Sequence, residues 1–341
     1  MTDLLNSRTE SNTPKFIMAA ALLFLVAGIF ITPNLLISLG PMRIALTSEI
    51  QSARDMAYFE VSLFRVCCVL LSILMIVAAF KWKQILSSKF VQRVNNHIVL
   101  ESNNYQTMMG ARNLSFIVIV ICIVLGIIYI ASGDLIFNDV QLKLINTEDG
   151  VIEYGSALFL ILSCIASLIL VFKWRGHKER VIMHSVFAFG FFAMAGEEIS
   201  WGQRIFNLDT LEAIKDLNIQ NENTLHNLLG YFADHLFIAI VFIYGAVMPY
   251  VAYTNKFFRK FFDYIGVPIA SLGLAIGFLI ITMMQSWTVY RIFEPLPHLR
   301  MPELRELYTA IAFSLLMYES WLLCKDRRSV NLSDKKSKNE Q

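Results

Sequence analysis

Two adjacent carboxylates, Glu197 and Glu198, follow an apolar run from Val181 to Ala195. A charged side chain at bilayer depth costs about 2.5–3.5 kcal/mol on insertion scales, so such residues usually serve a task. A carboxylate pair can accept a proton, bind a divalent metal or hold a cationic substrate group. We therefore interpret Glu197 and Glu198 as candidate catalytic residues, acting as a general base or as metal ligands.

The residues that follow the pair are also polar or aromatic. On a continuous helix, Glu197 shares one face with Trp201 and Arg204. Arg204 would then hold an anionic head group, while Trp201 and Gln203 bind the substrate. The structural alternative is an ion pair between one glutamate and an arginine of the bundle: Arg204, Arg65 or Arg291. Two carboxylates for one local arginine favour a further task.

A second polar stripe begins about twenty residues later in the chain. Asn223, Asn227 and Asp234 fall on one side of an expected helix with His226 on its flank, and leucines occupy the opposite side. We interpret His226 as the acid/base partner of the glutamates, and the other three as substrate-binding residues. A connection this short makes the two helices antiparallel neighbours, so we expect one glutamate within about 8 Å of His226 or Asn227.

Glutamate and histidine are common ligands of catalytic zinc. No HExxH motif or other tight ligand spacing is present, so the sequence leaves open whether a divalent metal is a cofactor. If a metal is bound, the candidate ligands are Glu198, His226 and His235. The alternative for each histidine is a hydrogen-bonded group at the membrane interface. The five cysteines all lie in apolar runs, which predicts buried thiols rather than disulfides.

The stretch from about residue 190 to 230 resembles a known group of sequences. The resemblance is carried by GEEISWGQR at 196–204, by four polar residues and by Leu225-His226-Asn227, the four being Asn218, Gln220, Glu222 and Asn223. In these positions the chain resembles a family of bacterial multi-pass membrane proteins that has no established activity. The resemblance implies a bacterial inner membrane and supports the choice of site, and it transfers no reaction.

Long apolar runs recur through the 341 residues, of which 56% are hydrophobic and only 16% are charged. Soluble globular domains carry about 25% charged residues. We therefore expect an all-α, polytopic transmembrane helical bundle whose partners are membrane lipids. No basic arm with interleaved aromatic residues is present, which argues against a nucleic-acid partner. No GxSxG, P-loop or Rossmann fingerprint is present either.

The apolar runs predict about eight spans. They are residues 16–39, 61–80, 115–132, 151–172 and 181–195, a run ending near 253, residues 268–287 and a run ending at 324. The predicted organisation is a cytoplasmic tail at 1–15, a single transmembrane domain at 16–324 with an extracytoplasmic excursion at 207–223, and a basic cytoplasmic tail at 325–341. Asp209 and Glu212 have capping-box spacing, which predicts a short surface helix within the excursion.

The charges of the predicted loops are strongly sided. With eight spans, 20 of the 29 Lys and Arg residues fall on the side of the two termini, and 18 of the 27 carboxylates fall on or near the other side. The positive-inside rule then places both termini in the cytoplasm of a bacterial inner membrane. An acidic outer face favours divalent cations or cationic groups over a freely diffusing polyanion.

These features favour a membrane-embedded enzyme that acts on a lipid or lipid-linked substrate by hydrolysis or group transfer. Its extracytoplasmic pocket would be formed by the outer ends of the second, fourth, fifth, sixth and eighth spans. The alternatives are an ion- or proton-coupled transporter and a structural or assembly subunit of a membrane complex. Carboxylates at the outer ends favour the enzyme, and Glu319, near the cytoplasmic end of the last span, is the exception that weakens this argument.

Overall fold

The protein is all-α in the computed structural model, which describes residues 2–40, 42–49, 51–99, 105–146, 150–206, 231–284 and 301–339. Within these ranges, six helices are long and apolar enough to cross a membrane. Their apolar segments are Thr13–Phe30, Arg54–Phe80, Arg112–Ile130, Val151–Lys173, Phe232–Thr254 and Met301–Cys324. The chain is therefore a multi-pass integral membrane protein, in which helices satisfy the backbone groups that lipid cannot.

Two compact units make up the chain: residues 1–96 with 229–235, and residues 97–228 with 236–341. The helices of the first unit are α1 (Thr2–Phe30), α2 (Pro33–Leu39), α3 (Arg43–Leu46), α4 (Gln51–Phe80), α5 (Trp82–Leu86), α6 (Lys89–Asn95) and the start of α14 (Tyr231–Phe242). Those of the second unit are α7 (Tyr105–Ile136), α8 (Asp139–Asn146), α9 (Val151–Lys173), α10 (Lys178–Glu198), η1 (Ser200–Gly202), α11 (Gln203–Phe206), the rest of α14, η2 (Ile243–Val247), α15 (Met248–Thr254), α16 (Lys256–Tyr264), α17 (Leu272–Met283) and α19 (Met301–Asn339).

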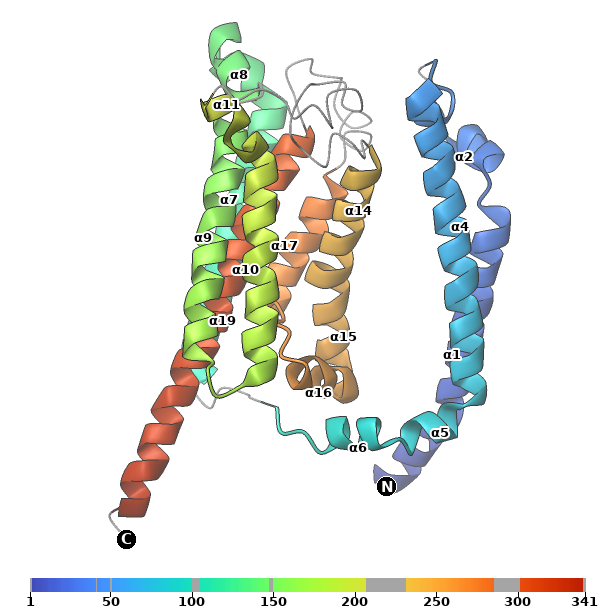
Figure 1. Ribbon diagram of the computed structural model, residues 1–341, viewed down its shortest axis with the longest axis vertical. Coiled ribbons are helices and arrows are strands. Elements are labelled where there is room, and N and C mark those ends of the chain that lie inside the picture. Colours follow the sequence, from blue (N-terminus) through green and yellow to red (C-terminus); the bar gives the residue numbers. More distant parts are fainter. Residues whose placement is uncertain are drawn as a thin grey trace. The chain divides into compact units, whose positions relative to one another are not determined.

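The pairing of α1 with α4 builds the first unit (Figure 1). The two helices approach closely at Gly28, where a Cβ atom would lie 2.9 Å from Cγ2 of Val69. Arg65 of α4 donates from Nε to the carbonyl oxygen of Gly28 at 3.0 Å. The basic side chain inside this span therefore has a task in helix packing.

The run expected to form the first span, residues 16–39, is broken near Thr32. α1 ends at Phe30, and the Thr32 side chain accepts a hydrogen bond from the backbone N–H of Leu35 at 3.3 Å, as the N-cap of α2. Pro33 is the first residue of α2, a position where the missing N–H costs nothing. At its other end α1 begins at Thr2, so the described part of the predicted tail is helical.

In the second unit, α9 and α10 form an antiparallel hairpin and α19 packs against α9 (Figure 1). The Ser163 Oγ of α9 lies 2.9 Å from the Ser314 Oγ of α19. One turn further, the Ser167 hydroxyl donates to the Met317 sulfur at 3.0 Å. Small polar residues allow such close helix contacts in membranes. α9 therefore packs against both α10 and α19.

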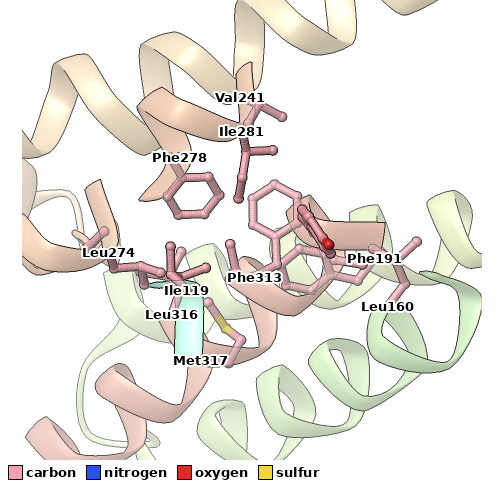
Figure 2. Close-up of a cluster of buried hydrophobic side chains, with 14 of the residues drawn as sticks. Ile119, Leu160, Phe191, Val241, Leu274, Phe278, Ile281, Phe313, Leu316 and Met317 are labelled. Carbon is pink, nitrogen blue, oxygen red and sulfur yellow. The ribbon is translucent and has the colours of Figure 1, made fainter. Parts of the chain in front are cut away.

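An apolar cluster fills the centre of this unit (Figure 2). The Phe313 ring of α19 lies 5.1 Å from the Phe191 ring of α10 and 5.5 Å from the Phe278 ring of α17, measured between centroids. Phe278 packs against the π-helical turn η2 at Gly245, where a Cβ atom would lie 2.4 Å from its Cγ. The cluster therefore fixes α10, α17 and α19 to one another.

The six apolar helices correspond to the expected first, second, third, fourth, sixth and eighth spans. The expected fifth span is α10, which also carries Arg180, His184 and the glutamate pair and is too polar to be counted with them. The expected seventh span contains α17, a shorter apolar helix, and residues 285–287 of that span lie outside the described ranges. The number of eight spans and their orientation stay predictions.

Candidate functional site

The two glutamates at the end of α10 are directed to different partners. The Oε2 atom of Glu198 accepts a short hydrogen bond from the Ser156 hydroxyl of α9. That hydroxyl also lies 2.8 Å from the carbonyl oxygen of Glu153, one turn earlier in α9. The Oε1 atom of Glu197 instead accepts a hydrogen bond from Nε1 of Trp201 at 2.8 Å. Glu198 thus ties α10 to α9, whereas the Trp201 partner of Glu197 belongs to the same segment of chain.

The backbone becomes left-handed one residue after the pair, beyond Ile199. α10 ends at Glu198, and Ser200, Trp201 and Gly202 have φ angles of 47°, 53° and 78°. The expectation of a continuous helix beyond the pair is therefore wrong, because three consecutive residues leave the right-handed region. The expected proximity of Glu197 and Trp201 is nevertheless found, since the turn returns the indole to the carboxylate.

The Trp201 indole lies on the backbone of the helix it follows. A Cβ atom at Gly196 would lie 2.8 Å from Cε3 and Cζ3 of the ring, so only glycine fits there. The Phe192 ring contacts the indole edge to face, with centroids 6.0 Å apart. Trp201 as a whole is 46% exposed, which leaves room for a further group beside it. Trp201 is consequently a rigid, partly open aromatic surface next to Glu197.

Other predicted residues near the turn are more enclosed. Gln203, predicted to bind substrate, is buried together with Ser200. Arg204 lies in α11, and its side chain is outside the described part of the structure. The placement of Gln203 therefore favours a role in holding the turn, and the role of Arg204 stays a prediction.

Sequence reasoning missed two residues at this end of the second unit. Ser156 is the α9 partner of Glu198, and its only signal in the sequence is a small polar residue in an apolar run. Arg305 of α19 is 1% exposed. It lies two residues from Leu307, whose Cδ1 would be 3.1 Å from a Cβ atom at Gly155, the residue before Ser156. An arginine inside the last apolar run could have been selected as a partner for the glutamates.

Asp234 of the second polar stripe and the candidate ligand His235 lie at the start of α14. Nδ1 of His235 lies 2.8 Å from Oε2 of Glu60 on α4, within the first unit. The rings of Phe59 and Phe232 meet edge to face beside this pair, at 5.8 Å. Asp234 is half-buried at the preceding position. His235 is thus held by Glu60, a carboxylate that sequence reasoning did not select.

The remaining predicted site residues are Asn223, His226 and Asn227, which lie outside the described residues. The expected distance of about 8 Å between a glutamate and His226 or Asn227 therefore stays a prediction. Within the described ranges, no three His, Cys, Asp or Glu side chains come together as a metal site. Because His226 is not among them, the proposed ligand set of Glu198, His226 and His235 also stays open.

A second polar cluster lies at the opposite end of α10. Arg180 is buried and forms a short salt bridge with Oδ1 of Asp263 on α16. Oδ2 of the same carboxylate lies 2.7 Å from Nε2 of His97. The Arg180 guanidinium also lies over the Trp174 ring, 4.7 Å from its centroid. Three segments that are distant in sequence are therefore joined at one carboxylate.

Glu319, the exception among the predicted carboxylates, has a structural task. Its Oε2 accepts from the Ser271 backbone N–H at 2.8 Å and its Oε1 accepts from the Ser271 hydroxyl at 2.7 Å. Ser271 is the N-cap of α17, where unpaired N–H groups favour a negative charge. The buried carboxylate thus stabilises the start of a helix.

The site at the end of α10 combines a carboxylate, an exposed indole and a strained turn. Such a set can accept a proton from, or bind a cationic group of, a molecule at the membrane surface. Comparison of the chain with protein-family models, with curated proteins and with solved structures found no match.

Proposed function

We propose that the chain is an enzyme of the bacterial inner membrane that acts at its extracytoplasmic face on a lipid or lipid-linked substrate, by hydrolysis or group transfer. The observation that carries the proposal is the left-handed turn Ser200–Gly202, which begins one residue after the carboxylate pair. Strained backbone of this kind costs about 1–3 kcal/mol per residue and is concentrated at functional sites. A turn that only ended a helix would need one left-handed residue, usually a glycine.

The geometry supports different roles for the two glutamates. Glu197 is the better general base, because it lies beside the partly exposed indole of Trp201, where a substrate can approach. Glu198 would hold this base in position through Ser156. His226 would supply the acid/base partner and Arg204 would bind an anionic head group. Gln203 would hold the turn, and Asn223 and Asn227 would position the substrate.

The proposal predicts that Glu197→Gln abolishes function without removing the protein. Glutamine keeps the oxygen that accepts from Trp201, but it cannot accept a proton. Lipidomics of a deletion strain should show an accumulated precursor, which the wild-type gene clears and the Glu197→Gln gene does not. Glu179→Gln, in the first turn of the same helix, is the matched control and should clear it. If both variants clear the precursor, or if the Glu197→Gln protein is lost from the membrane, Glu197 and Glu198 have a structural role and not a catalytic one.

A second candidate function, an ion- or proton-coupled transporter, is favoured by His184. This side chain is fully buried in α10, and neither ring nitrogen has a hydrogen-bond partner among the described residues. Ionisable residues inside a membrane bundle are frequent in proton relays. In this case the deletion strain would keep its lipid composition. The His184→Ala variant would lose uptake of the transported solute, and the Glu197→Gln variant would retain it.

The proposed orientation makes a separate prediction. In the second unit, the α9–α10 connection, α16 and the end of α19 lie at one end of the bundle and α8 at the other (Figure 1). This supports placing the basic connections together on the cytoplasmic side. Reporter fusions after Arg93, Lys178, Lys260 and the C-terminus should report cytoplasm, and fusions after Asp139, Glu212 and His298 should report the outside. If two or more fusions report the side opposite to the one expected, the site cannot be extracytoplasmic.

A further inference from the structure

The end of α1 frees the carbonyl oxygen of Gly28 from the hydrogen bonds of the helix. In a continuing helix this oxygen would accept from the backbone N–H of Thr32, four residues later. That N–H instead donates to the carbonyl oxygen of Phe30 at 2.9 Å. Nε of Arg65, on the neighbouring helix α4, donates to the Gly28 oxygen at 3.0 Å in its place. One edge of the Arg65 guanidinium is therefore fixed by the end of α1.

The other edge of the same guanidinium carries Nη1 and Nη2, with four further N–H donors. Among the residues that the structure describes, neither nitrogen has a hydrogen-bond acceptor or a carboxylate as partner. Glu60, five positions earlier on α4, is held by His235 instead, at 2.8 Å. Because an unpaired charge is costly at membrane depth, Arg65 requires a counter-ion from beyond these residues.

The depth of Arg65 in the membrane follows from its place in the helix. α4 ends at Phe80, fifteen residues after Arg65, which is about 22 Å at the rise of an α-helix. The exposed Lys81 follows directly and marks the level of the head groups at that end. Because the hydrocarbon core is about 30 Å thick, Arg65 lies about 8 Å inside the opposite boundary.

The helix α1 supports the same depth. Its apolar segment begins at Thr13, and Gly28 lies fifteen residues further along, so both partners of the hydrogen bond are equally far from the other end of the helix pair. Side chains of a helix point toward its N-terminus. The Arg65 side chain therefore extends from α4 toward the nearer boundary, where α2 follows the end of α1 (Figure 1).

We propose that the Nη1 and Nη2 groups of Arg65 bind the phosphate of a membrane phospholipid. The planar fork of a guanidinium matches two phosphate oxygens, and lipid phosphates lie at the boundary toward which this side chain extends. Phe64 and Val66, which flank Arg65 on α4, are 48% and 54% exposed and give an acyl chain an apolar surface. These residues all belong to the first unit, and the binding does not depend on whether Glu197 serves an enzyme or a transporter.

Native mass spectrometry of the full-length protein measures this binding. The protein is purified in detergent with equal amounts of phosphatidylglycerol and glucosyl diacylglycerol of identical acyl chains, and the retained lipids are counted. Wild type should retain the phospholipid in excess, because the glycolipid has no phosphate. Arg65→Gln should lower the ratio of phospholipid to glycolipid about tenfold, the effect of losing hydrogen bonds to a charged group.

Two other variants separate the fork from the charge. Arg54→Gln is the matched control, since Arg54 lies on the same helix about 39 Å from Phe80, beyond the hydrocarbon core, and donates from Nη1 to the Ser48 carbonyl oxygen at 3.1 Å. It should leave the ratio unchanged. Arg65→Lys keeps the charge without the fork and should give a ratio between those of wild type and Arg65→Gln.

Three results would overturn the phospholipid site. The first is a ratio near one for wild type, and the second is an equal ratio for Arg65→Gln and Arg54→Gln. If the Arg65→Gln protein does not reach the membrane, Arg65→Lys takes its place, and a wild-type ratio for that variant counts against the site. The third is displacement of phosphatidylglycerol by excess inorganic phosphate, which would assign Arg65 to a free anion. Inorganic phosphate has no acyl chains, so we expect no displacement.

Discussion

Asp263→Ala is expected to destabilise the protein by about 3–5 kcal/mol, the cost of breaking a buried ion pair by removing one partner. The substitution leaves the Arg180 guanidinium buried without the carboxylate that now faces it, and it also releases His97. The free energy of unfolding in mixed detergent–SDS micelles measures the effect. Arg180→Ala should be similarly costly, because it removes both the ion pair and the packing on Trp174.

Two controls show whether burial is the cause. Glu179→Gln alters the adjacent residue, whose 3.6 Å pair with His177 is partly exposed, and it should cost less than about 1 kcal/mol. The double change Arg180→Met with Asp263→Leu should recover much of the lost stability, because it leaves no unpaired charge in the cluster. A cost for Asp263→Ala no larger than that of Glu179→Gln would show that the pair is solvated.

Gly266→Ala is expected to cost about 2–5 kcal/mol, which combines a left-handed backbone penalty of about 1–2 kcal/mol with an overpacking penalty of about 1–3 kcal/mol. Gly266 has a φ of 78°, and a Cβ atom there would lie 2.7 Å from the backbone N of Arg180 and from the carbonyl C of Glu179. Both close contacts are backbone atoms, so no side-chain rotation relieves them. The same unfolding measurement applies.

Gly40→Ala separates the two contributions. Gly40 also has a positive φ, of 96°, but a Cβ atom there meets nothing within 4 Å. Its substitution should therefore cost only the backbone penalty of about 1–2 kcal/mol. If Gly40→Ala and Gly266→Ala lower the free energy of unfolding equally, the loop that contains Gly266 moves away from α10. Its contact with Arg180 then contributes little to stability.

The membrane class and most helices follow from local composition. Apolar runs of about twenty residues predict spanning helices, because no other local structure satisfies the backbone in lipid. All six long apolar helices overlap predicted runs. The break at Thr32 was readable in principle, since a capping threonine followed by proline is a strong local helix-start signal.

The partners of the polar side chains could not be predicted in the same way. Glu198 contacts a serine 42 positions earlier, and His235 contacts Glu60 at a separation of 175 positions. A sequence shows that a buried carboxylate needs a partner, but many residues can meet that need. The choice depends on which helices are neighbours and at what height they meet.

The sequence by itself determined that this is an all-helical membrane protein with carboxylates at the end of one helix, because hydropathy and charge act residue by residue. The tertiary structure decided that Glu197 faces Trp201 through a left-handed turn, that Glu198 faces Ser156 on α9, and that Asp263 joins Arg180 to His97. These contacts depend on the packing of several helices at once. Helix–helix packing in a membrane is selected by close steric fit, which the sequence of any one helix does not contain.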